Sequence, residues 1–167
     1  MPHPHVLLVT GASRGIGAAT ARLAASQGWA VAVNYVGNSL AADEVVRHIR
    51  AGGGRAIAIQ GNVALEADVL CMFRQIDAKL GPLTGLVNNA GVVDVACRVD
   101  NLSVERLHRQ WSVNVLGSMV CAREAVRRMS TRHGGEGGSI VNVSSVAATL
   151  GAPGQYVDYA ACKGAID

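Results

Sequence analysis

The sequence is poor in aromatic residues and in lysine, and it has no long apolar run. Only 4% of its 167 residues are aromatic although 50% are hydrophobic, so the apolar content is mostly Val, Ala, Leu and Ile. Such residues are typical of buried parallel strands covered by helices. No stretch approaches the roughly eighteen consecutive apolar residues that would indicate a membrane-spanning helix. The start, Met-Pro-His-Pro-His, lacks the basic and apolar segments of a signal peptide, so we expect a cytoplasmic protein with no membrane partner.

Strong net charge and paired cysteines are also lacking. The formal net charge of +3 is small and the arginines are scattered, which argues against a nucleic-acid partner. The four cysteines have no close paired spacing, so we expect neither a metal site nor a disulfide framework. Unpaired cysteines fit a reducing, cytoplasmic compartment. His3 and His5 could bind a metal adventitiously, but we assign them to a solvated N-terminus.

What is present is a regular alternation of short Val-rich runs and longer helical patterns. Strands are expected over residues 6–10, 29–34, 56–60, 83–88 and 140–143. Helices are expected over residues 15–27, 39–51, 69–80 and 104–132, and from Val157 onward. This order predicts an α/β fold, a Rossmann-type doubly wound parallel sheet, in a single domain over residues 1–167. The last helix has barely begun at Asp167, so we expect a domain that is truncated, with its C-terminal strands missing.

Two helix starts and one helix face are visible in the pattern. Ser39 and Ser103 are placed as N-caps, because a serine hydroxyl can accept a hydrogen bond from a free backbone N–H of the first turn. An apolar stripe follows the long helix at helical spacing; it consists of Leu107, Trp111, Val115, Met119, Ala122, Val126 and Met129.

A glycine-rich loop, Thr10-Gly11-Ala12-Ser13-Arg14-Gly15-Ile16-Gly17, joins the first strand to the first helix. Gly11 suits a sharp turn, Gly15 lets the backbone approach a pyrophosphate, and Gly17 lets the helix pack close to the strand. The helix N-terminus then offers free N–H groups and a positive dipole end to phosphates. The spacing is G-x-x-x-G-x-G, and the alternative is an ordinary tight turn. Its place between a strand and a helix favours the nucleotide-binding interpretation.

With the later landmarks, this octapeptide resembles the short-chain dehydrogenase/reductase (SDR) family, in particular its bacterial glucose-dehydrogenase-like and 3-oxoacyl-acyl-carrier-protein-reductase-like branch. Those landmarks are Asn88-Asn89-Ala90-Gly91, Asn114, Ser145 and Tyr159-Ala160-Ala161-Cys162-Lys163. The resemblance implies a homo-dimer or homo-tetramer, if full length, that packs its long helices together. The predicted cofactor-binding residues are Gly11, Ser13, Arg14, Gly15, Ile16, Gly17, Asn34, Tyr35, Asn62, Val63, Asn89, Ala90, Gly91, Tyr159 and Lys163.

The end of the second strand indicates which nicotinamide cofactor is preferred. An acidic residue there would bind the ribose 2′-hydroxyl of NAD, whereas a basic residue accommodates the 2′-phosphate of NADP. The strand ends Val33-Asn34-Tyr35-Val36 without an acid, and Arg14 offers a phosphate-binding guanidinium. We therefore predict NADP(H) over NAD(H), the alternative being that Arg14 only faces solvent. The family usually has Asp where Asn62 stands, and Asn can still hydrogen-bond an adenine.

Tyr159 and Lys163 are the predicted chemical centre. Lys163 lies four residues after Tyr159, which places both on one helix face. A nearby cation favours the phenolate, and so lowers a tyrosine pKa that is ordinarily about 10. Tyr156 has no Lys or Arg three or four residues later and is the weaker candidate. In isolation, such a Tyr–Lys pair would more often be a chance surface pair.

Ser145 and Asn114 complete the predicted catalytic set. Ser145 follows the fifth strand and could donate to a substrate carbonyl oxygen, with Ser144 as a strand-end hydrogen-bonding residue. The interval from Ser145 to Tyr159 is one residue longer than in many family members. Asn is a poor helix former, and the resemblance implies that Asn114 distorts the helix and holds a water linked to Lys163. The alternative is a solvent-facing Asn114.

The sequence thus predicts an NADP(H)-dependent oxidoreductase that interconverts a small secondary alcohol and a ketone. Tyr159 is the acid and base, Ser145 polarises the carbonyl, Lys163 tunes Tyr159 and holds the ribose, and Asn114 supports the proton path. The alternative is a non-enzymatic fragment, a nucleotide-binding or interaction module that associates through its long helix.

Overall fold

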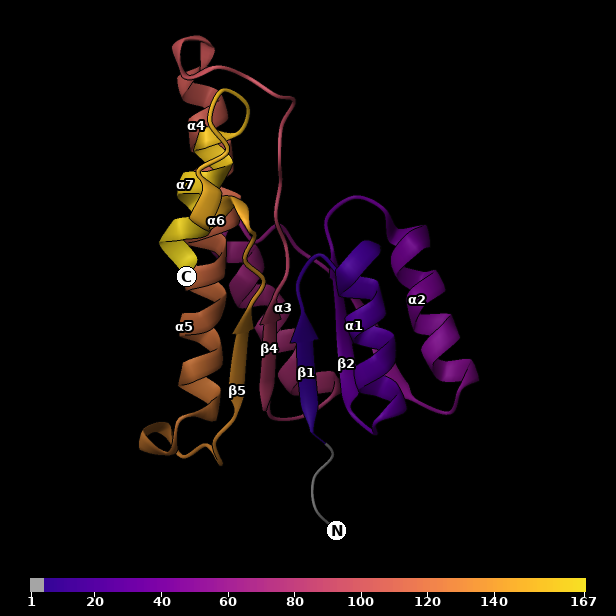
Figure 1. Cartoon of the computed structure of the whole chain (residues 1–167). Coiled ribbons are helices and arrows are strands. Elements are labelled where there is room, and N and C mark those ends of the chain that lie inside the picture. The colour runs from indigo at the N-terminus through magenta and orange to yellow at the C-terminus, as the bar shows by residue number, and fades with distance from the viewer. Residues whose placement is uncertain (1–4) are drawn as a thin grey trace.

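The computed structural model describes residues 5–167, which form one five-stranded sheet with helices on both faces (Figure 1). The strands are β1 (Val6–Val9), β2 (Ala30–Tyr35), β3 (Arg55–Gln60), β4 (Gly85–Asn88) and β5 (Ser139–Asn142). Their order in the sheet is β3-β2-β1-β4-β5, and all four neighbouring pairs are parallel. This confirms the doubly wound α/β fold. His5 is exposed, whereas His3 lies outside the described residues.

Two apolar cores flank the sheet because successive strand residues point to opposite faces. Leu8 of β1 packs into one core with Phe73 of helix α3 and Ala125 of helix α5. Val9, the next residue, packs into the other core with the small residues of helix α1, such as Ala21. The helices nearest the sheet are α1 (Gly15–Ser26), α2 (Ser39–Ala51), α3 (Glu66–Lys79) and α5 (Gly117–Met129).

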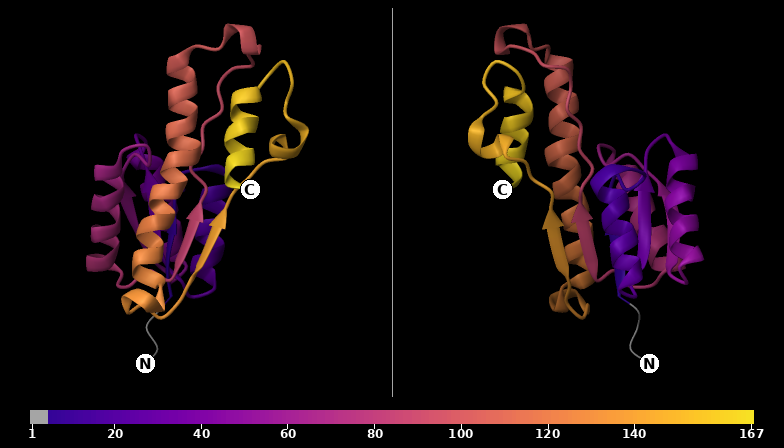
Figure 2. Two further views of the ribbon diagram at one scale, coloured as in Figure 1. Left: turned by 90° about the vertical axis from the view of Figure 1, so that its left-hand side faces the viewer. Right: turned by 45° about the vertical axis from the view of Figure 1, so that its right-hand side comes forward.

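The long helix contains a π-helical segment that the apolar pattern did not predict. Helix α4 (Val104–Trp111), the π segment (Ser112–Leu116) and α5 follow one another without a break and project beyond the sheet (Figure 2). A π turn inserts an extra residue and rotates the faces on its two sides relative to each other. Of the apolar stripe, only Val115 and Met129 are buried, while Trp111, Met119 and Val126 are exposed.

The C-terminal part of the chain lies above the carboxyl ends of β4 and β5. It comprises the short helix α6 (Ala147–Leu150) and helix α7 (Val157–Ile166), and α7 packs against α6, α4 and the π segment. Short 3₁₀ helices η1 (Val99–Asn101) and η3 (Thr131–His133) lie at the two ends of the long helix. In both views of Figure 2, α7 runs beside the long helix at the end of the sheet away from the N-terminus.

The two helix caps predicted from the sequence have different outcomes. The cap of α2 is Asn38, whose Oδ1 accepts a hydrogen bond from the Ala41 N–H at 3.0 Å, so the assignment of Ser39 as the cap is wrong. Asn and Ser cap equally well, and local composition does not separate neighbouring candidates. The Ser103 cap is confirmed: its hydroxyl accepts from the Arg106 N–H at 3.1 Å. No helix within residues 5–167 is both long and apolar enough to cross a membrane.

Candidate active site

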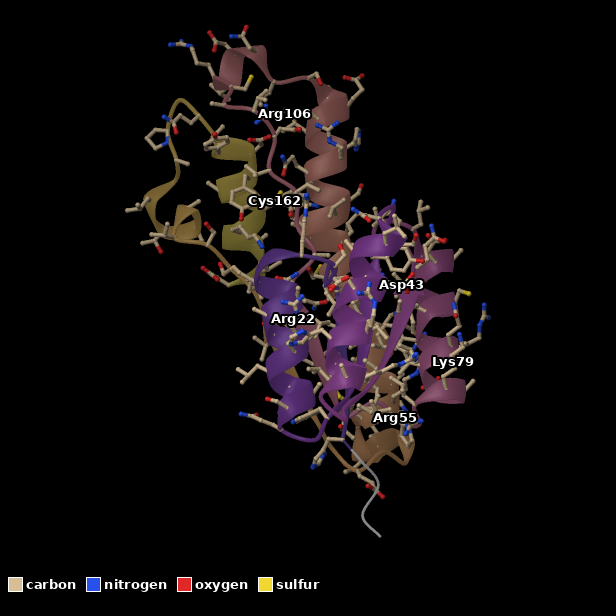
Figure 3. All side chains as sticks on the ribbon, turned by 90° about the vertical axis from the view of Figure 1, so that its right-hand side faces the viewer. Arg22, Asp43, Arg55, Lys79, Arg106 and Cys162 are labelled. Atoms are coloured by element: carbon tan, nitrogen blue, oxygen red, sulfur yellow. The ribbon has the colours of Figure 1, made fainter. Side chains whose placement is uncertain are left out.

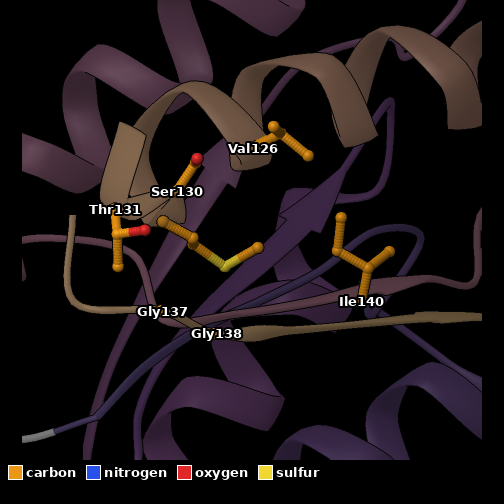
Figure 4. A pocket seen from close by; sticks show the side chains of 7 residues that line it. Val126, Ser130, Thr131, Gly137, Gly138 and Ile140 are labelled. Atoms are coloured by element: carbon orange, nitrogen blue, oxygen red, sulfur yellow. The ribbon is translucent and has the colours of Figure 1, made fainter. Parts of the chain in front are cut away.

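The candidate site lies at the carboxyl edge of the parallel sheet, where ligands bind in open α/β folds. The loops that follow β1, β4 and β5 lie along this edge, and α7 lies above β5 at one side of it (Figure 1). A separate pocket of about 340 Å³ lies at the opposite, amino end of β5, between Val126, Met129, Ser130 and Thr131 on one side and Gly138 and Ile140 on the other (Figure 4). It contains none of the predicted site residues.

The glycine loop has the backbone geometry that its sequence predicts. Gly11 and Gly15 have φ angles of +62° and +56°, which L side chains rarely adopt. A Cβ on Gly11 would lie 3.0 Å from the Cα of Ala90, and one on Gly17 would lie 2.8 Å from the carbonyl oxygen of Gly11. A Cβ on Gly15 would meet nothing within 4 Å. Gly11 and Gly17 thus permit close packing, while Gly15 borders open space.

The N-terminus of α1 fits an anionic group. Arg14 occupies the cap position with an extended backbone, and its side chain makes no capping hydrogen bond. The first turn of α1 contains no acidic side chain, so its N–H groups and positive dipole end stay available. Arg14 and Ile16 are exposed beside this helix end, and Ser13 is half-buried. These features suit a pyrophosphate. Direct contacts between these residues and the cofactor stay predictions.

Asn34 supports the glycine loop from within the sheet. Its side chain is 1% exposed, and its Oδ1 accepts a hydrogen bond from the Gly11 N–H at 3.0 Å. Its Nδ2 donates to the carbonyl oxygen of Gly61 at 2.9 Å. Tyr35 and Val36, which follow Asn34, carry no charge, so this end of β2 lacks a carboxylate. Asn34 is therefore a buried structural contact, and its predicted cofactor contact is untested.

The loop after β4 is fastened to the glycine loop through Thr10. The Thr10 hydroxyl oxygen accepts hydrogen bonds from the N–H groups of Asn89 and Ala90 at 3.0 and 2.9 Å. Asn89 Nδ2 donates in return to the carbonyl oxygens of Thr10 and Gly11 at 2.8 and 3.1 Å. The sequence pattern predicts no role for Thr10, although a polar residue at the buried end of an otherwise apolar strand is a visible signal.

Asn62 and Val63 lie at the start of the loop that leads into α3. Asn62 Oδ1 accepts from the Ala64 N–H at 3.0 Å, so this side chain makes a local turn contact. Val63 is 5% exposed and packs against Gly117, where a Cβ would come within 2.8 Å of Val63 Cγ2. The contact of both residues with an adenine stays a prediction.

Asn114 lies in the π segment and is 1% exposed, which excludes the solvent-facing alternative. Its Oδ1 accepts from the Val92 N–H at 2.9 Å, and its Nδ2 donates to the Val92 carbonyl oxygen at 2.9 Å. The Asn114 side chain thereby pairs with both backbone polar groups of Val92, as a neighbouring strand would. The predicted distortion of the helix at Asn114 is present as the π turn.

Lys163 reaches from α7 to the same place. It is 4% exposed, and its Nζ donates to the carbonyl oxygen of Val143 at 2.6 Å. Burial lowers the pKa of this amine, because desolvation disfavours the charged form. A Cβ on Gly91 would lie 3.0 Å from Asn114 Oδ1 and 3.7 Å from Lys163 Nζ. Gly91, Asn114 and Lys163, from three distant segments, therefore converge.

Tyr159 and the two serines complete the site. The Lys163 Nζ lies 5.7 Å from the centre of the Tyr159 ring, and Tyr159 is half-buried. Ser145 Oγ accepts from the Ala147 N–H at 3.2 Å, which leaves its own proton available for donation. Ser144 Oγ is buried and has no hydrogen-bond partner among the described residues. The fold therefore brings Tyr159, Lys163 and Asn114 to the edge that the glycine loop also occupies.

Comparisons with known proteins agree with this arrangement. Residues 5–167 match the family described as short chain dehydrogenase. The oxidoreductase YgfF of Escherichia coli K12, itself uncharacterized, is 55% identical over 97% of this chain and 66% of its own length. A 3-oxoacyl-[acyl-carrier-protein] reductase, FabG, of Staphylococcus aureus is 39% identical over 95% of this chain and 63% of its own length.

A solved structure shows the same fold. A doubly substituted variant of a Serratia marcescens short-chain dehydrogenase/reductase superposes with a TM-score of 0.91 at 35% identity, covering 99% of this chain and 66% of that one. The chain thus spans slightly less than two thirds of the length of these relatives. On its sequence and on its fold, the chain belongs to the short-chain dehydrogenase/reductase family.

Proposed function

We propose that this chain carries the cofactor-binding and catalytic part of an NADP(H)-dependent oxidoreductase that interconverts a secondary alcohol and a ketone. The observation that carries the proposal is the convergence of Gly91, Asn114 and Lys163 beside Tyr159, at the edge where the glycine loop opens. When bound, NADPH supplies the hydride that ends on the carbonyl carbon of the substrate. The chain's own residues have to bind the cofactor, orient the substrate and protonate the carbonyl oxygen.

Tyr159 is the proposed proton donor. Its hydroxyl proton passes to the carbonyl oxygen during reduction, and the phenolate that remains takes a proton back from solvent before the next turnover. The buried ammonium of Lys163 supports this step, because a cation close to the ring favours the phenolate. One proton of Lys163 Nζ is bonded to the Val143 carbonyl, and the other two are available for a ribose hydroxyl and the Tyr159 oxygen.

Ser145 and Asn114 have supporting roles in the proposal. Ser145 donates its hydroxyl proton to the substrate oxygen as negative charge develops there. Its accepted hydrogen bond from Ala147 fixes the oxygen while leaving the proton free. Asn114 holds the segment after β4 in place through Val92 and supports a proton path from Lys163.

The preference for NADP(H) is proposed on two features of the adenosine side. Arg14 is exposed next to an uncapped helix end, and β2 ends without a carboxylate that would repel a 2′-phosphate. A guanidinium forms strong, charge-assisted hydrogen bonds to phosphate.

The proposal also covers the oligomeric state, the compartment and the substrates of the protein. Exposed Trp111, Met119 and Val126 on the long helix suit association with a second copy, as a homo-dimer or homo-tetramer. All four cysteines are free thiols, which supports a reducing, cytoplasmic compartment. The name of the Staphylococcus aureus relative makes small 3-oxo compounds the first substrates to test.

The test uses the 167-residue chain itself. NADPH and NADH binding are measured by nucleotide fluorescence, and NADPH oxidation is followed with ethyl acetoacetate and with acetoacetyl-coenzyme A. The proposal expects NADPH binding and ketone-dependent oxidation. Binding without oxidation of either compound would contradict the reductase proposal for this chain and favour a nucleotide-binding module. An unfolded chain that binds neither nucleotide would contradict both.

A further inference from the structure

An ion pair clamps the start of α7 to α4. Arg106 Nε donates to Asp158 Oδ2 at 2.6 Å, and Arg106 Nη2 donates to Asp158 Oδ1 at 3.1 Å. Two parallel N–H···O bonds of this kind fix relative orientation as well as distance. The Asp158 side chain is 1% exposed and that of Arg106 is 11% exposed, so solvent screens the pair little. The sequence pattern predicts no role for either residue.

The same guanidinium also holds the segment that follows β4. Arg106 Nη1 donates to the carbonyl oxygen of Val95 at 2.8 Å. Close by, the Cys97 N–H donates to the carbonyl oxygen of Gln155 at 2.7 Å, which ties that segment to the loop before α7. Arg106 therefore joins α4, the segment after β4 and α7. Figure 3 shows Arg106 in the upper part of the molecule, above the labelled Cys162 of α7.

The place of Asp158 in the chain makes the pair relevant to the site. Asp158 directly precedes Tyr159, and Lys163 lies one turn further along the same helix. Helix α7 is thus held in its first turn by Arg106 and in its second by the bond from Lys163 to Val143. The guanidinium lowers the pKa of Asp158 and so keeps the pair ionised. Misplacing a reacting group by about 1 Å can cost about 100-fold in rate.

We propose that Arg106 and Asp158 are positioning residues that set Tyr159 and Lys163 against Asn114, and that turnover depends on them far more than cofactor binding does, because the glycine loop supplies most of the cofactor contacts and Lys163 only a ribose contact. The inference rests on the proposed function. Neither residue reaches the reacting atoms in this proposal, because each acts through the placement of α7. The glycine loop and α1, which form the nucleotide cradle, make no hydrogen bond to either side chain among the described residues.

The variants Asp158→Asn and Arg106→Lys test the proposal, with Asp100→Asn as the matched control. The control removes the charge from an exposed pair, since Arg98 and Asp100 are 74% and 59% exposed. We expect Asp158→Asn to lower kcat for the NADPH-dependent reduction of ethyl acetoacetate about 100-fold, with a much smaller change in Kd for NADPH. Arg106→Lys keeps the charge but loses the fork, so its kcat should lie between those of wild type and Asp158→Asn.

Deuterium exchange provides a readout that does not need turnover. We expect faster exchange in the peptide over residues 157–166 of Asp158→Asn, and unchanged exchange in β1 and α1. Exchange confined to α7 supports the clamp even if wild type fails to turn over, an outcome that contradicts only the proposed function. Unchanged exchange in α7, a kcat equal to that of the control, or a parallel loss of kcat and NADPH affinity overturns the inference. If Asp158→Asn fails to fold, Arg106→Lys decides by the same criteria.

Discussion

The two halves of the sheet differ in how their functional residues are held. In the nucleotide half, residues 5–80, strands β1 and β2 are almost fully buried and the glycine loop rests on neighbouring backbone. In the catalytic half, residues 81–167, β5 is largely exposed, with Val141 53% exposed. There the site depends on long-range side-chain hydrogen bonds of Asn114, Lys163 and Arg106.

The difference indicates that the first half mainly binds the nucleotide and the second half mainly places the catalytic groups. The cradle for the nucleotide is built on one local strand–loop–helix unit, which buried packing and hydrogen bonds from Asn34 and Asn89 support. The catalytic groups come from several distant segments and are placed by long-range side-chain hydrogen bonds. Changes in the nucleotide half should therefore act mainly on Kd for the nucleotide, and changes around Tyr159 in the catalytic half should act mainly on kcat.

The largest effect is expected for Lys163→Met. Removal of the buried ammonium withdraws the cation beside Tyr159, and kcat for ethyl acetoacetate should fall about 1,000-fold. Lys79→Met is the matched control, because Lys79 is the only other lysine of the sequence and is exposed at the end of α3. Equal kcat values for the two variants would remove Lys163 from the proposed mechanism.

Arg14→Gln tests the cofactor preference in the nucleotide half. Loss of a charge-assisted bond to the 2′-phosphate, about 1.5–3 kcal/mol, should raise Kd for NADPH roughly 10- to 100-fold and leave Kd for NADH unchanged. The control is Arg22→Gln, at an exposed position on the same helix and labelled in Figure 3. Fluorescence titration with both nucleotides gives the comparison. An equal change for NADPH and NADH would contradict a 2′-phosphate contact.

A smaller effect is expected for Gly17→Ala. The new Cβ would lie 2.8 Å from the Gly11 carbonyl oxygen, which is backbone and cannot rotate away. Overpacking of this kind costs about 1–3 kcal/mol and displaces the loop, so Kd for NADPH should rise about tenfold. Gly52→Ala is the control, since its Cβ would meet its nearest atom at 3.6 Å. A loss of kcat at saturating NADPH without a change in Kd would contradict the expectation that changes in the nucleotide half act mainly on nucleotide binding.

The smallest effect concerns the start of α2. Asn38→Ala should lower the free energy of unfolding by about 1 kcal/mol, because the bond to the Ala41 N–H is lost. Ser39→Ala, one residue further, should change it much less. Urea unfolding of both variants gives the values, and the reverse order would restore Ser39 as the cap.

Sequence and structure agree where the information is local. Each strand of the sheet and the glycine loop could be predicted, because periodicity and glycine spacing are properties of neighbouring residues. The pairing of Arg106 with Asp158 could not, because the two residues meet only after α7 folds back onto α4. The exposure of Trp111 and Met119 was equally hidden, because an apolar stripe at helical spacing does not tell a face that packs on the sheet from one that stays exposed.

The central claim is that Tyr159, and not its neighbour, donates the proton. The direct measurement is the single-turnover rate of NADPH oxidation by ethyl acetoacetate in Tyr159→Phe and Tyr156→Phe, at NADPH concentrations that saturate both variants. We expect Tyr159→Phe to lose about 1,000-fold in this rate with a much smaller change in Kd for NADPH, and Tyr156→Phe to stay close to wild type. A Tyr159→Phe variant that reacts as fast as Tyr156→Phe would contradict it.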